Sequence, residues 1–266
     1  MRTLVIGDLH GSYKGLLQCL ERSKFDYEKD RLVCLGDVCD GFPFVKECFD
    51  ELLKLKHLIY IKGNHDEWAE EWYSYSKQYR MVNHPRTNHN IWYSQGGSQT
   101  YQSYLRVSEN YESHYSEMDA AHLDLISKAR YYYIQDNKLF VHGGINPTKG
   151  MAIEKQKTHL MVWDRDLLEG AWEKSQNHPK YKFSDYDEIF VGHTTTQWFV
   201  RNKDKSILTA SELAKIGTEP LFLCNVIALD TGGGWNGKVT IMDAYSKEYY
   251  QSDLAGELYP DQTGRR

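Results

Sequence analysis

The amino-acid sequence predicts an α/β protein with two packed β-sheets flanked by helices, and three observations lead to that prediction. Short apolar runs alternate with helix-like segments from Met1 to Asp66, which is typical of βαβ units and a parallel sheet. The chain after residue 187 is rich in short β-like segments that end in two hairpin-like returns. The length of 266 residues suits one large domain, or a domain with an inserted cap.

The first quarter of the chain alternates regularly between strand-like and helix-like segments. Apolar runs at Thr3–Ile6, Leu32–Leu35 and Leu58–Ile61 have the length of buried strands, and helices are expected around Ser12–Arg22 and Phe44–Leu55. Strands separated by helices of this size are joined by right-handed crossovers, so we expect them to be parallel.

The next segment has a different character. Residues 67–130 are crowded with Tyr, Trp, Ser, Asn and His, and they predict a mostly helical, aromatic-rich insert or cap within a single domain that spans residues 1–266. Inside this insert, Gly96–Gly97 predicts a tight turn before a new helix near Gln99–Leu105.

The last half of the chain is expected to be rich in strands. Asp136–Asn137 has the composition of a two-residue hairpin turn between Tyr131–Gln135 and Lys138–Val141, and a helix is expected near His159–Ala171. Residues 252–266 are polar and contain Gly and Pro, so they predict a flexible tail. The remaining strand-like segments are Glu188–Val191, Gln197–Arg201, Lys205–Leu208, Leu223–Leu229 and Lys238–Ala244.

Composition and charge exclude several classes of protein. Hydrophobic residues make up 41% and charged residues 26% of the chain, so it can bury enough apolar surface to fold. The formal net charge is −5 and the basic residues are scattered, so we do not expect a nucleic-acid partner. No apolar stretch approaches the roughly 20 residues of a membrane span. Five cysteines without C-x-x-C spacing favour a reducing compartment, and we expect a cytoplasmic protein.

Five short segments combine glycine with aspartate, asparagine or histidine, and each stands at the end of an apolar run. The carboxyl ends of strands in an open α/β sheet line a common crevice, so loops far apart in sequence can deliver side chains to one point. The sequence therefore predicts that these segments meet in one site. They are GDLHG at Gly7–Gly11, GDVCDG at Gly36–Gly41, GNHD at Gly63–Asp66, VHGG at Val141–Gly144 and GHT at Gly192–Thr194.

The residue types in these segments suit divalent metals. Asp8 and His10 are two residues apart at a strand end, so they can bind one cation together, and a carboxylate with an imidazole suits Mn, Fe or Zn. Asp37 could bridge two cations through its two oxygens. Each residue alone has an ordinary alternative: Asp8 could cap the helix at Ser12 beside a surface histidine, and Asp37 could be a turn residue.

Three further residues extend the candidate ligand set. Asn64 offers a neutral carbonyl oxygen, and His142 and His193 offer ring nitrogens. Taken singly, the asparagine reads as a turn residue and His142 as a core histidine that is satisfied by the backbone. The joint occurrence of all five segments favours a site for two metal ions.

The order of these motifs resembles the calcineurin-like metallophosphoesterases, and most closely the bacterial and phage serine/threonine-phosphatase type. VWDR at Val162–Arg165 resembles the arginine-bearing segment of that family, and LDTGGG at Leu229–Gly234 resembles its closing strand motif. The resemblance covers nearly the whole chain. It implies the metallo-dependent phosphatase fold, a four-layer α/β/β/α sandwich in which helices flank two mixed sheets.

The resemblance also implies an activity and its cofactors. We expect hydrolysis of phosphomonoesters by direct attack of a hydroxide that bridges two divalent metal ions, without a covalent phosphoenzyme. Mn²⁺ is the preferred ion, with Fe, Zn or Ni as alternatives. The first metal would bind Asp8, His10 and Asp37, and the second would bind Asp37, Asn64, His142 and His193.

Three more residues receive roles from the same resemblance. His65 would be the general acid that protonates the leaving alcohol, and Asp40 would orient it. Arg165, together with Asn64, would bind the substrate phosphate. The alternative for Arg165 is a surface salt bridge to Asp164 or Asp166.

One position departs from the family pattern. Where the family has an arginine that binds phosphate after Asp40, this chain has Gly41, which carries no charge. We hypothesise that Lys62, Arg80 or Arg86 takes over that role.

The substrate could be a phosphoprotein, a nucleotide or a small phosphoester. The enzymatic alternatives are a nucleotide or dinucleoside polyphosphate hydrolase and a polynucleotide phosphatase, and the alternative of another class is a catalytically inactive module that recognises phosphate.

Overall fold

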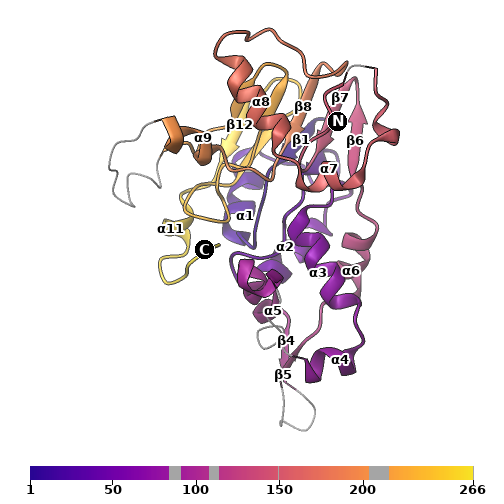
Figure 1. The fold of residues 1–266 in the computed structure, drawn as a ribbon. Helices are drawn as coiled ribbons and strands as arrows, with labels where there is room; N and C mark the ends of the chain where they lie inside the picture. The colour runs from indigo at the N-terminus through magenta and orange to yellow at the C-terminus, as the bar shows by residue number, and fades with distance from the viewer. Residues whose placement is uncertain (84–90, 108–113, 149, 204–215, 266) are drawn as a thin grey trace.

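Two mixed five-stranded sheets form the centre of the molecule (Figure 1). The computed structural model describes residues 1–83, 91–107, 114–148, 150–203 and 216–265. The first sheet has the order β12-β11-β1-β2-β3, and the second has the order β6-β7-β8-β10-β9. Their strands are β1 (Thr3–Ile6), β2 (Arg31–Cys34), β3 (His57–Tyr60), β11 (Thr240–Asp243) and β12 (Tyr249–Gln251) in the first sheet, and β6 (Tyr132–Gln135), β7 (Lys138–Val141), β8 (Glu188–Val191), β9 (Leu221–Leu223) and β10 (Val226–Ala228) in the second.

The expected parallel strands are confirmed in both sheets. Strands β1, β2 and β3 pair in parallel, with Val5 opposite Val33, and β7, β8 and β10 are also parallel. The outer strands β12 and β11, β6 and β9 run antiparallel to their neighbours. The predicted hairpin turn at Asp136–Asn137 joins β6 to β7, and both turn residues have positive φ.

The two sheets pack face to face through alternate residues of their strands. Val5 and Val33 point toward the second sheet, where they meet Phe140 and Phe190, whose rings stack 4.9 Å apart. Because side chains alternate along a strand, Leu4 and its equivalents on the neighbouring strands point to the opposite face. Each sheet therefore has one face for the other sheet and one face for helices.

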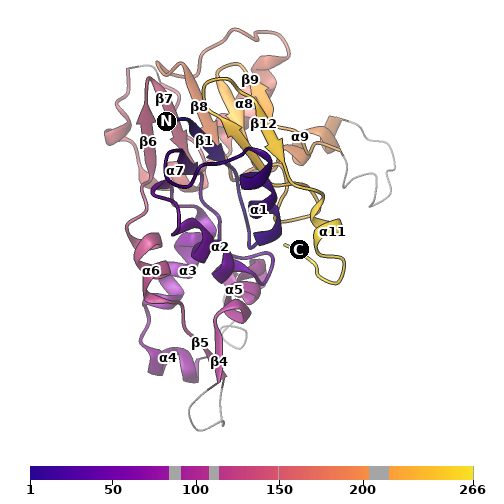
Figure 2. The ribbon, with the colours of Figure 1, turned by 180° about the vertical axis from the view of Figure 1, so that it is seen from behind.

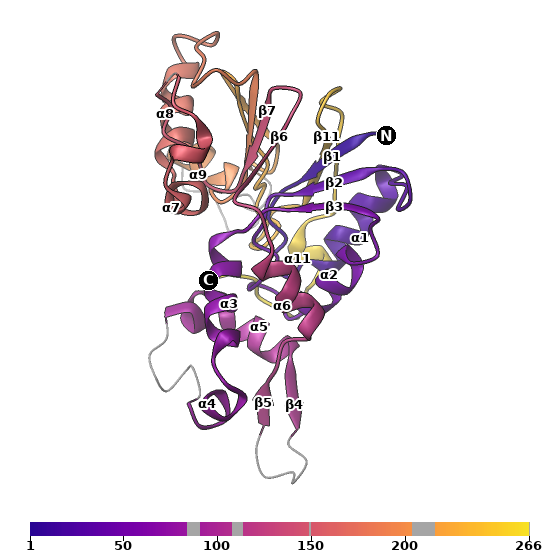
Figure 3. The ribbon, with the colours of Figure 1, turned by 90° about the vertical axis from the view of Figure 1, so that its right-hand side faces the viewer.

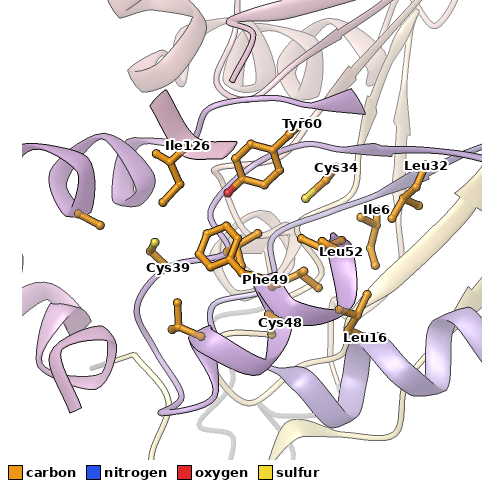
Figure 4. Close-up of a cluster of buried hydrophobic side chains, with 14 of the residues drawn as sticks. Ile6, Leu16, Leu32, Cys34, Cys39, Cys48, Phe49, Leu52, Tyr60 and Ile126 are labelled. Carbon is orange, nitrogen blue, oxygen red and sulfur yellow. The ribbon is translucent and has the colours of Figure 1, made fainter. Parts of the chain in front are cut away.

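Helices cover the outer faces, which completes the four layers expected from the sequence (Figure 3). On the first sheet, α1 (Tyr13–Arg22) and α2 (Val45–Leu52) bury Leu16, Phe49 and Leu52 against Leu32 (Figures 2 and 4). The outer face of the second sheet is covered by α7 (Thr158–Trp163) and α8 (Asp166–Ser175), with η2 (Ile153–Lys155) before them. None of the described helices has the length and apolar character needed to cross a bilayer.

The segment for which the sequence predicts a helical insert contains helices and a pair of strands. It runs through α3 (Asn64–Ser74), α4 (Lys77–Val82), η1 (Tyr93–Gly97), α5 (Ser98–Ser103) and α6 (Ala120–Ser127). Gly96 has a φ of 111° and forms the predicted turn between η1 and α5. The antiparallel pair β4 (Leu105–Val107) and β5 (His114–Ser116) was not anticipated.

Two predictions about secondary structure were wrong. The segment Gln197–Arg201 is not a strand but part of helix α9 (Thr196–Lys203). Gln197 and Phe199 are buried while Trp198 is 55% exposed, which imitates the alternation of a strand over three residues. The single helix expected near His159–Ala171 is interrupted at Asp164, whose extended backbone separates α7 from α8. The expected strand Lys205–Leu208 lies outside the described residues.

The end of the chain packs on the first sheet's helical side. Residues 252–265, where the sequence predicts a flexible tail, include the short helix α11 (Ala255–Leu258). Tyr259 is buried, its ring stacks on Phe42 with centroids 4.4 Å apart, and its hydroxyl accepts a hydrogen bond from Lys14 N over 2.7 Å. This packing directs the following residues toward the carboxyl ends of the strands.

Candidate metal centre

The five glycine-containing motifs meet at one end of the two sheets. Strands β1, β2 and β3 are followed by the segments with Asp8, Asp37 and Asn64, and β7 and β8 of the second sheet are followed directly by His142 and His193. The side chains of all the predicted ligands are buried. The sheets therefore converge on one site, as the motif positions predict.

Asp37 lies at the centre of this site. Its Oδ2 is 3.6 Å from His10 Nε2 and 3.4 Å from His142 Nε2, and it makes no hydrogen bond within the described residues. Asp37 belongs to two clusters of potential metal ligands, one with His10 and His65 and one with His142 and His193. Its other oxygen, Oδ1, accepts a hydrogen bond from the backbone N–H of His65 over 2.9 Å.

The remaining predicted ligands surround Asp37. Asp8 Oδ2 is 3.9 Å from His10 Nε2, and the Asp8 carboxylate accepts the backbone N–H of His193. Asn64 Oδ1 lies 3.1 Å from His142 Nε2 and 2.8 Å from His193 Nδ1. The structure thus brings together every residue that the sequence proposes as a ligand, from both ends of the chain.

The surrounding backbone orients two histidines toward the centre. The ring Nδ1 atoms of His10 and His142 face the carbonyl oxygens of Cys39 and Leu35, at 2.8 Å and 2.7 Å. Because a carbonyl can only accept, each Nδ1 donates, and Nε2 is the nitrogen that the neutral ring would offer to a metal. This tautomer is the one that metal-binding histidines usually adopt.

Glycine allows the backbone to come close to the two carboxylates. A Cβ atom at Gly63 would lie 2.1 Å from Asp37 Oδ1, and a Cβ atom at Gly192 would lie 2.3 Å from Asp8 Oδ1. Any other residue would therefore displace a carboxylate. Close approach is the physical reason for glycine in the GNHD and GHT motifs.

Four candidate site residues have a left-handed backbone, with φ of 46° at His10, 50° at Asp37, 73° at Asp40 and 64° at His193. Such conformations are costly for residues other than glycine and gather at functional sites. Each of these residues lies in the loop that follows β1, β2 or β8, where the chain turns so that the side chain enters the site.

Burial and neighbouring charges shift the pKa values of the two carboxyl groups of the site in opposite directions. Burial raises the pKa of Asp8 well above its usual value, and Asp230 adds to this shift. Burial opposes ionisation of Asp37 too, but His142 and His65 hold the pKa of Asp37 well below its usual range. Burial likewise disfavours a charged His142, yet Asp37 raises its pKa to about 9. His142 thus supplies the positive charge that a bound cation would otherwise provide.

In contrast to the charged ring of His142, the ring of His193 is neutral. Burial, His142 and Arg165 lower the pKa of His193 to about 2, so its imidazole is neutral. Its Nε2 atom is buried without a hydrogen-bond partner among the described residues, like Oδ2 of Asp37. Two orphaned buried acceptors beside carboxylates and imidazoles fit divalent metal ions, which bind deprotonated ligands of these types.

His65 and Asp40 form a hydrogen-bonded pair next to the ligands. His65 Nδ1 lies 2.5 Å from Asp40 Oδ2, and the rings of His65 and His10 are 4.9 Å apart. Asp40 Oδ1 accepts hydrogen bonds from Trp92 Nε1 over 2.9 Å and from Thr100 Oγ1 over 2.7 Å. Both donors come from the insert, and the sequence analysis missed them because nothing in a single sequence links residues 92 and 100 to residue 40.

Asp66, the last residue of the GNHD motif, holds the loop after β2. Its carboxylate accepts the backbone N–H groups of Asp37, Gly63, Val38 and Cys39, at 2.9, 3.0, 3.1 and 3.2 Å. The sequence analysis assigned this residue no role. The signal was its position in the first turn of a helix, where an acidic side chain commonly accepts backbone N–H groups.

Arg165 lies beside His193, and the break between α7 and α8 brings it there. Its Nη1 donates to Thr194 Oγ1 over 2.8 Å and to the His193 carbonyl over 3.3 Å. In the described part of the chain it forms no ion pair with Asp164 or Asp166. It lines a cavity of about 460 Å³ together with Asp230, Trp198, Trp235 and Arg265, among others.

The three basic residues suggested as substitutes for the family arginine do not line this cavity within the described structure. Lys62 is buried in an ion pair with Glu70 at 2.6 Å. Arg80 is buried and donates to the carbonyl oxygens of Tyr73 and Tyr75 in the insert. Arg86 lies outside the described residues. Arg265 reaches the site instead, and its distance of 255 residues from His10 left no local signal in the sequence.

Comparisons with known proteins identify relatives of this chain. The sequence model of the family described as calcineurin-like phosphoesterase matches residues 1–206. Serine/threonine-protein phosphatase 1 of Salmonella typhimurium is 35% identical over 65 residues, which cover 24% of this chain and only 30% of that protein. The symmetrical bis(5′-nucleosyl)-tetraphosphatase of Pseudomonas putida is 24% identical over an aligned length of 304 residues, gaps included, and the alignment covers 98% of this chain and 96% of that protein.

Solved structures support the fold. The crystal structure of a candidate diadenosine tetraphosphatase has a TM-score of 0.57 at 13% identity and covers 94% of this chain and 92% of its own. A metallophosphoesterase from Sphaerobacter thermophilus has a TM-score of 0.50 at 17% identity, with 96% and 89% covered. The two-sheet fold and the family match over residues 1–206 lead to the same conclusion: this chain belongs to the calcineurin-like phosphoesterases, a family of metal-dependent phosphoric ester hydrolases.

Proposed function

We propose that this protein is a dinuclear metal-dependent phosphoesterase that hydrolyses phosphomonoesters in the manner of a serine/threonine phosphatase. The observation that carries the proposal is Asp37 Oδ2, a buried acceptor without a hydrogen bond that lies between His10 Nε2 and His142 Nε2. In two-metal hydrolases the cations are about 3.5–4 Å apart, close enough for one carboxylate to bind both.

The ligand sets that we propose are those implied by the family resemblance, and their members surround Asp37. Asp8, His10 and Asp37 would hold the first metal, and Asp37 with Asn64, His142 and His193 would hold the second. We propose Mn²⁺ as the native ion because a mixed set of carboxylate, imidazole and amide ligands suits it. When bound, two such cations supply an activated water at neutral pH and neutralise charge on the attacking and leaving oxygens.

His65 would act as the general acid. Its Nδ1 donates to Asp40 Oδ2 over 2.5 Å, which fixes the ring and leaves Nε2 as the atom that gives a proton to the leaving alcohol. Asp40 in turn is held by Trp92 and Thr100, so the ring cannot rotate without breaking buried hydrogen bonds.

Arg165 would bind and orient the phosphoryl group, with Asn64 as a second contact. Two contacts of its Nη1 with Thr194 and the His193 backbone fix the guanidinium, while the absence of a carboxylate partner among the described residues leaves its charge available. A planar guanidinium can donate two parallel hydrogen bonds to phosphate oxygens, which fixes the phosphorus relative to His65.

A second candidate function is hydrolysis of dinucleoside polyphosphates. It is favoured by the relative that matches along nearly its full length, which is named as a symmetrical bis(5′-nucleosyl)-tetraphosphatase. Trp198 and Trp235 line the cavity beside Arg165, and exposed indole rings are suited to stack on nucleobases. The substrate screen must therefore include both classes.

The test is hydrolysis by protein loaded with Mn²⁺, Zn²⁺, Fe²⁺ or Ni²⁺. The substrates are p-nitrophenyl phosphate, a phosphoserine peptide, diadenosine tetraphosphate, a 5′-phosphorylated oligonucleotide and a 2′,3′-cyclic nucleotide. We expect release of phosphate from the monoesters, loss of activity in Asp37→Asn, and wild-type activity in the matched surface variant Asp253→Asn. A folded, metal-loaded protein that binds phosphate but hydrolyses none of these substrates would instead be a phosphate-recognition module.

A further inference from the structure

A second arginine reaches the candidate metal centre from the far end of the chain. Arg265 Nη1 lies 3.2 Å from His10 Nε2, and Arg265 lines the same cavity as Arg165. The end of the chain lies between the sheets and the insert, at the level of the strand ends (Figures 1 and 3). None of the family motifs in the sequence contains this residue.

Backbone and ring contacts hold Arg265 in this position. Its N–H donates to the carbonyl of Gly234 over 2.8 Å, and its guanidinium carbon lies 5.0 Å from the centre of the Trp235 ring. The preceding residue, Gly264, packs so closely that a Cβ atom there would lie 2.3 Å from the Gly234 oxygen. Further back, Tyr259 stacks on Phe42. The guanidinium is therefore placed by a fixed segment of chain.

The guanidinium of Arg265 shares its cavity with the carboxylate of Asp230 but is not paired with it. It forms no ion pair with any described residue, and its Nε is buried without an acceptor. Its Nη1 instead lies 3.2 Å from His10 Nε2, which can accept a hydrogen bond because Nδ1 of that ring donates to the Cys39 carbonyl. A metal ion at His10 would need the same lone pair. Metal binding would therefore release the guanidinium, and its donors would then face the cavity.

The side chain of Arg265 passes near Gly41, the position that lacks the family arginine. An ideal Cβ at Gly96 would contact both Gly41 N, at 3.1 Å, and Arg265 Cγ, at 3.6 Å, so the stem of Arg265 passes beside the Gly41 loop. A side chain at Gly41 itself would meet the His10 carbonyl oxygen at 2.7 Å, and its φ is +78°. A side chain at residue 41 would therefore be strained in this backbone, whereas the side chain of residue 265 reaches the cavity beside the metal centre.

We propose that Arg265 is a substrate-binding residue that binds the phosphoryl oxygens together with the sequence-predicted arginine, Arg165. This inference rests on the proposed function, since it assumes that a phosphate group enters the cavity next to the metals. Two guanidinium groups without carboxylate partners, brought from residues 165 and 265 to one cavity, are suited to a dianionic group such as a phosphomonoester.

The test measures phosphate binding directly, by calorimetric titration of inorganic phosphate into Mn²⁺-loaded protein. We expect Arg265→Gln to weaken phosphate binding at least tenfold and Arg265→Lys to lie between this variant and the wild type. The matched control Arg22→Gln removes the same charge from α1, where Arg22 pairs with Asp253, and should bind phosphate like the wild type. Gly264→Val, which displaces the segment without removing the charge, should reproduce the loss. Melting temperatures establish that each variant is folded.

An unchanged phosphate Kd in Arg265→Gln would overturn the assignment. If Mn²⁺ binding also became tighter in that variant, Arg265 would instead be a residue that competes with the metal for His10. Failure of the proposed function looks different: the wild type would hydrolyse no phosphoester, while its phosphate affinity could still depend on Arg265.

Discussion

Trp92 donates its indole N–H to Asp40 Oδ1 over 2.9 Å, and this bond ties the insert to the carboxylate that holds His65. Thr100 strengthens the connection, since its hydroxyl donates to the same oxygen and accepts the Asp40 N–H, both over 2.7 Å. The backbone of Asp40 has a φ of 73°, a conformation that needs such support. The insert therefore positions the proposed general acid, in addition to any part it plays at the rim of the site.

Replacing Thr100 tests this positioning. Thr100→Val keeps the shape of the side chain but removes the hydroxyl, so Asp40 loses two hydrogen bonds and His65 loses its fixed orientation. We expect kcat on p-nitrophenyl phosphate to fall about tenfold or more, because general acid catalysis is typically worth about 10²–10⁴. The unfolding free energy should fall by about 1–3 kcal/mol, because a buried N–H is left unpaired.

The control for Thr100 is Thr240→Val. Thr240 is also buried, and its hydroxyl is hydrogen-bonded to Thr231 on the first sheet. This variant should lose similar stability, measured by urea unfolding, but keep the wild-type kcat. If both variants lowered kcat equally, the positioning role of Thr100 would be wrong.

Metal binding should stabilise the fold. The orphaned acceptors Asp37 Oδ2 and His193 Nε2 gain a partner when a cation binds. At 100-fold excess over Kd, binding contributes about 2.7 kcal/mol, and each kcal/mol raises the Tm of a domain of this size by roughly 2–4 °C. We expect Mn²⁺ to raise the Tm of chelator-treated protein by about 5–10 °C in a scanning calorimeter. Asp37→Asn should lose most of this shift, and an undiminished shift would place the metal elsewhere.

Replacing Arg165 and replacing Arg80 should have different effects on turnover and stability. Arg165→Ala should lower kcat/KM on an aryl phosphate by about 10–100-fold, since a charge-assisted hydrogen bond is worth about 1.5–3 kcal/mol. Arg80 instead binds carbonyl groups inside the insert, so Arg80→Ala should lower stability and affect turnover much less. Steady-state kinetics with urea unfolding separates the two effects. Equal, small changes in turnover would refute the role of Arg165.

His122 should make stability depend on pH. Burial lowers its pKa in the folded state, and the facing charges of Asp50, Asp119 and Lys46 do not reverse this shift. The unfolded chain therefore takes up the proton first, at a pKa near 6.5. The stability that neutral His122 contributes is complete above about pH 6.5 and is lost as the pH falls toward its lower folded pKa.

Urea unfolding at pH 7.5 and pH 5.5 measures this contribution. The loss of unfolding free energy between the two pH values should be smaller in His122→Gln than in the wild type. His178→Gln changes an exposed histidine and should keep the wild-type difference. An equal difference in all three proteins would assign the pH dependence to other groups.

The sequence determined those features that short segments encode. Apolar runs followed by glycine, aspartate and histidine predict both the strands and the side chains at their ends, because strands of one parallel sheet share a carboxyl edge. This reasoning predicted two packed sheets with helices, and the resemblance of the motif order to a known family implied the four layers and the family. It also brought Asp8 and His193 into one proposed site, which the hydrogen bond from His193 N to the Asp8 carboxylate supports geometrically. The metal-binding roles themselves stay predictions.

Only the tertiary structure decided how distant segments complete the site. A strand and a short helix at Gln197 cannot be told apart by the alternation of three side chains, and burial of Phe199 against Trp172 selects the helix. The contacts of Trp92 with Asp40 and of Arg265 with His10 depend on the packing of an insert and a chain end onto the completed sheets. Local sequence carries no record of such contacts, because their free energy arises only when both partners have been buried together.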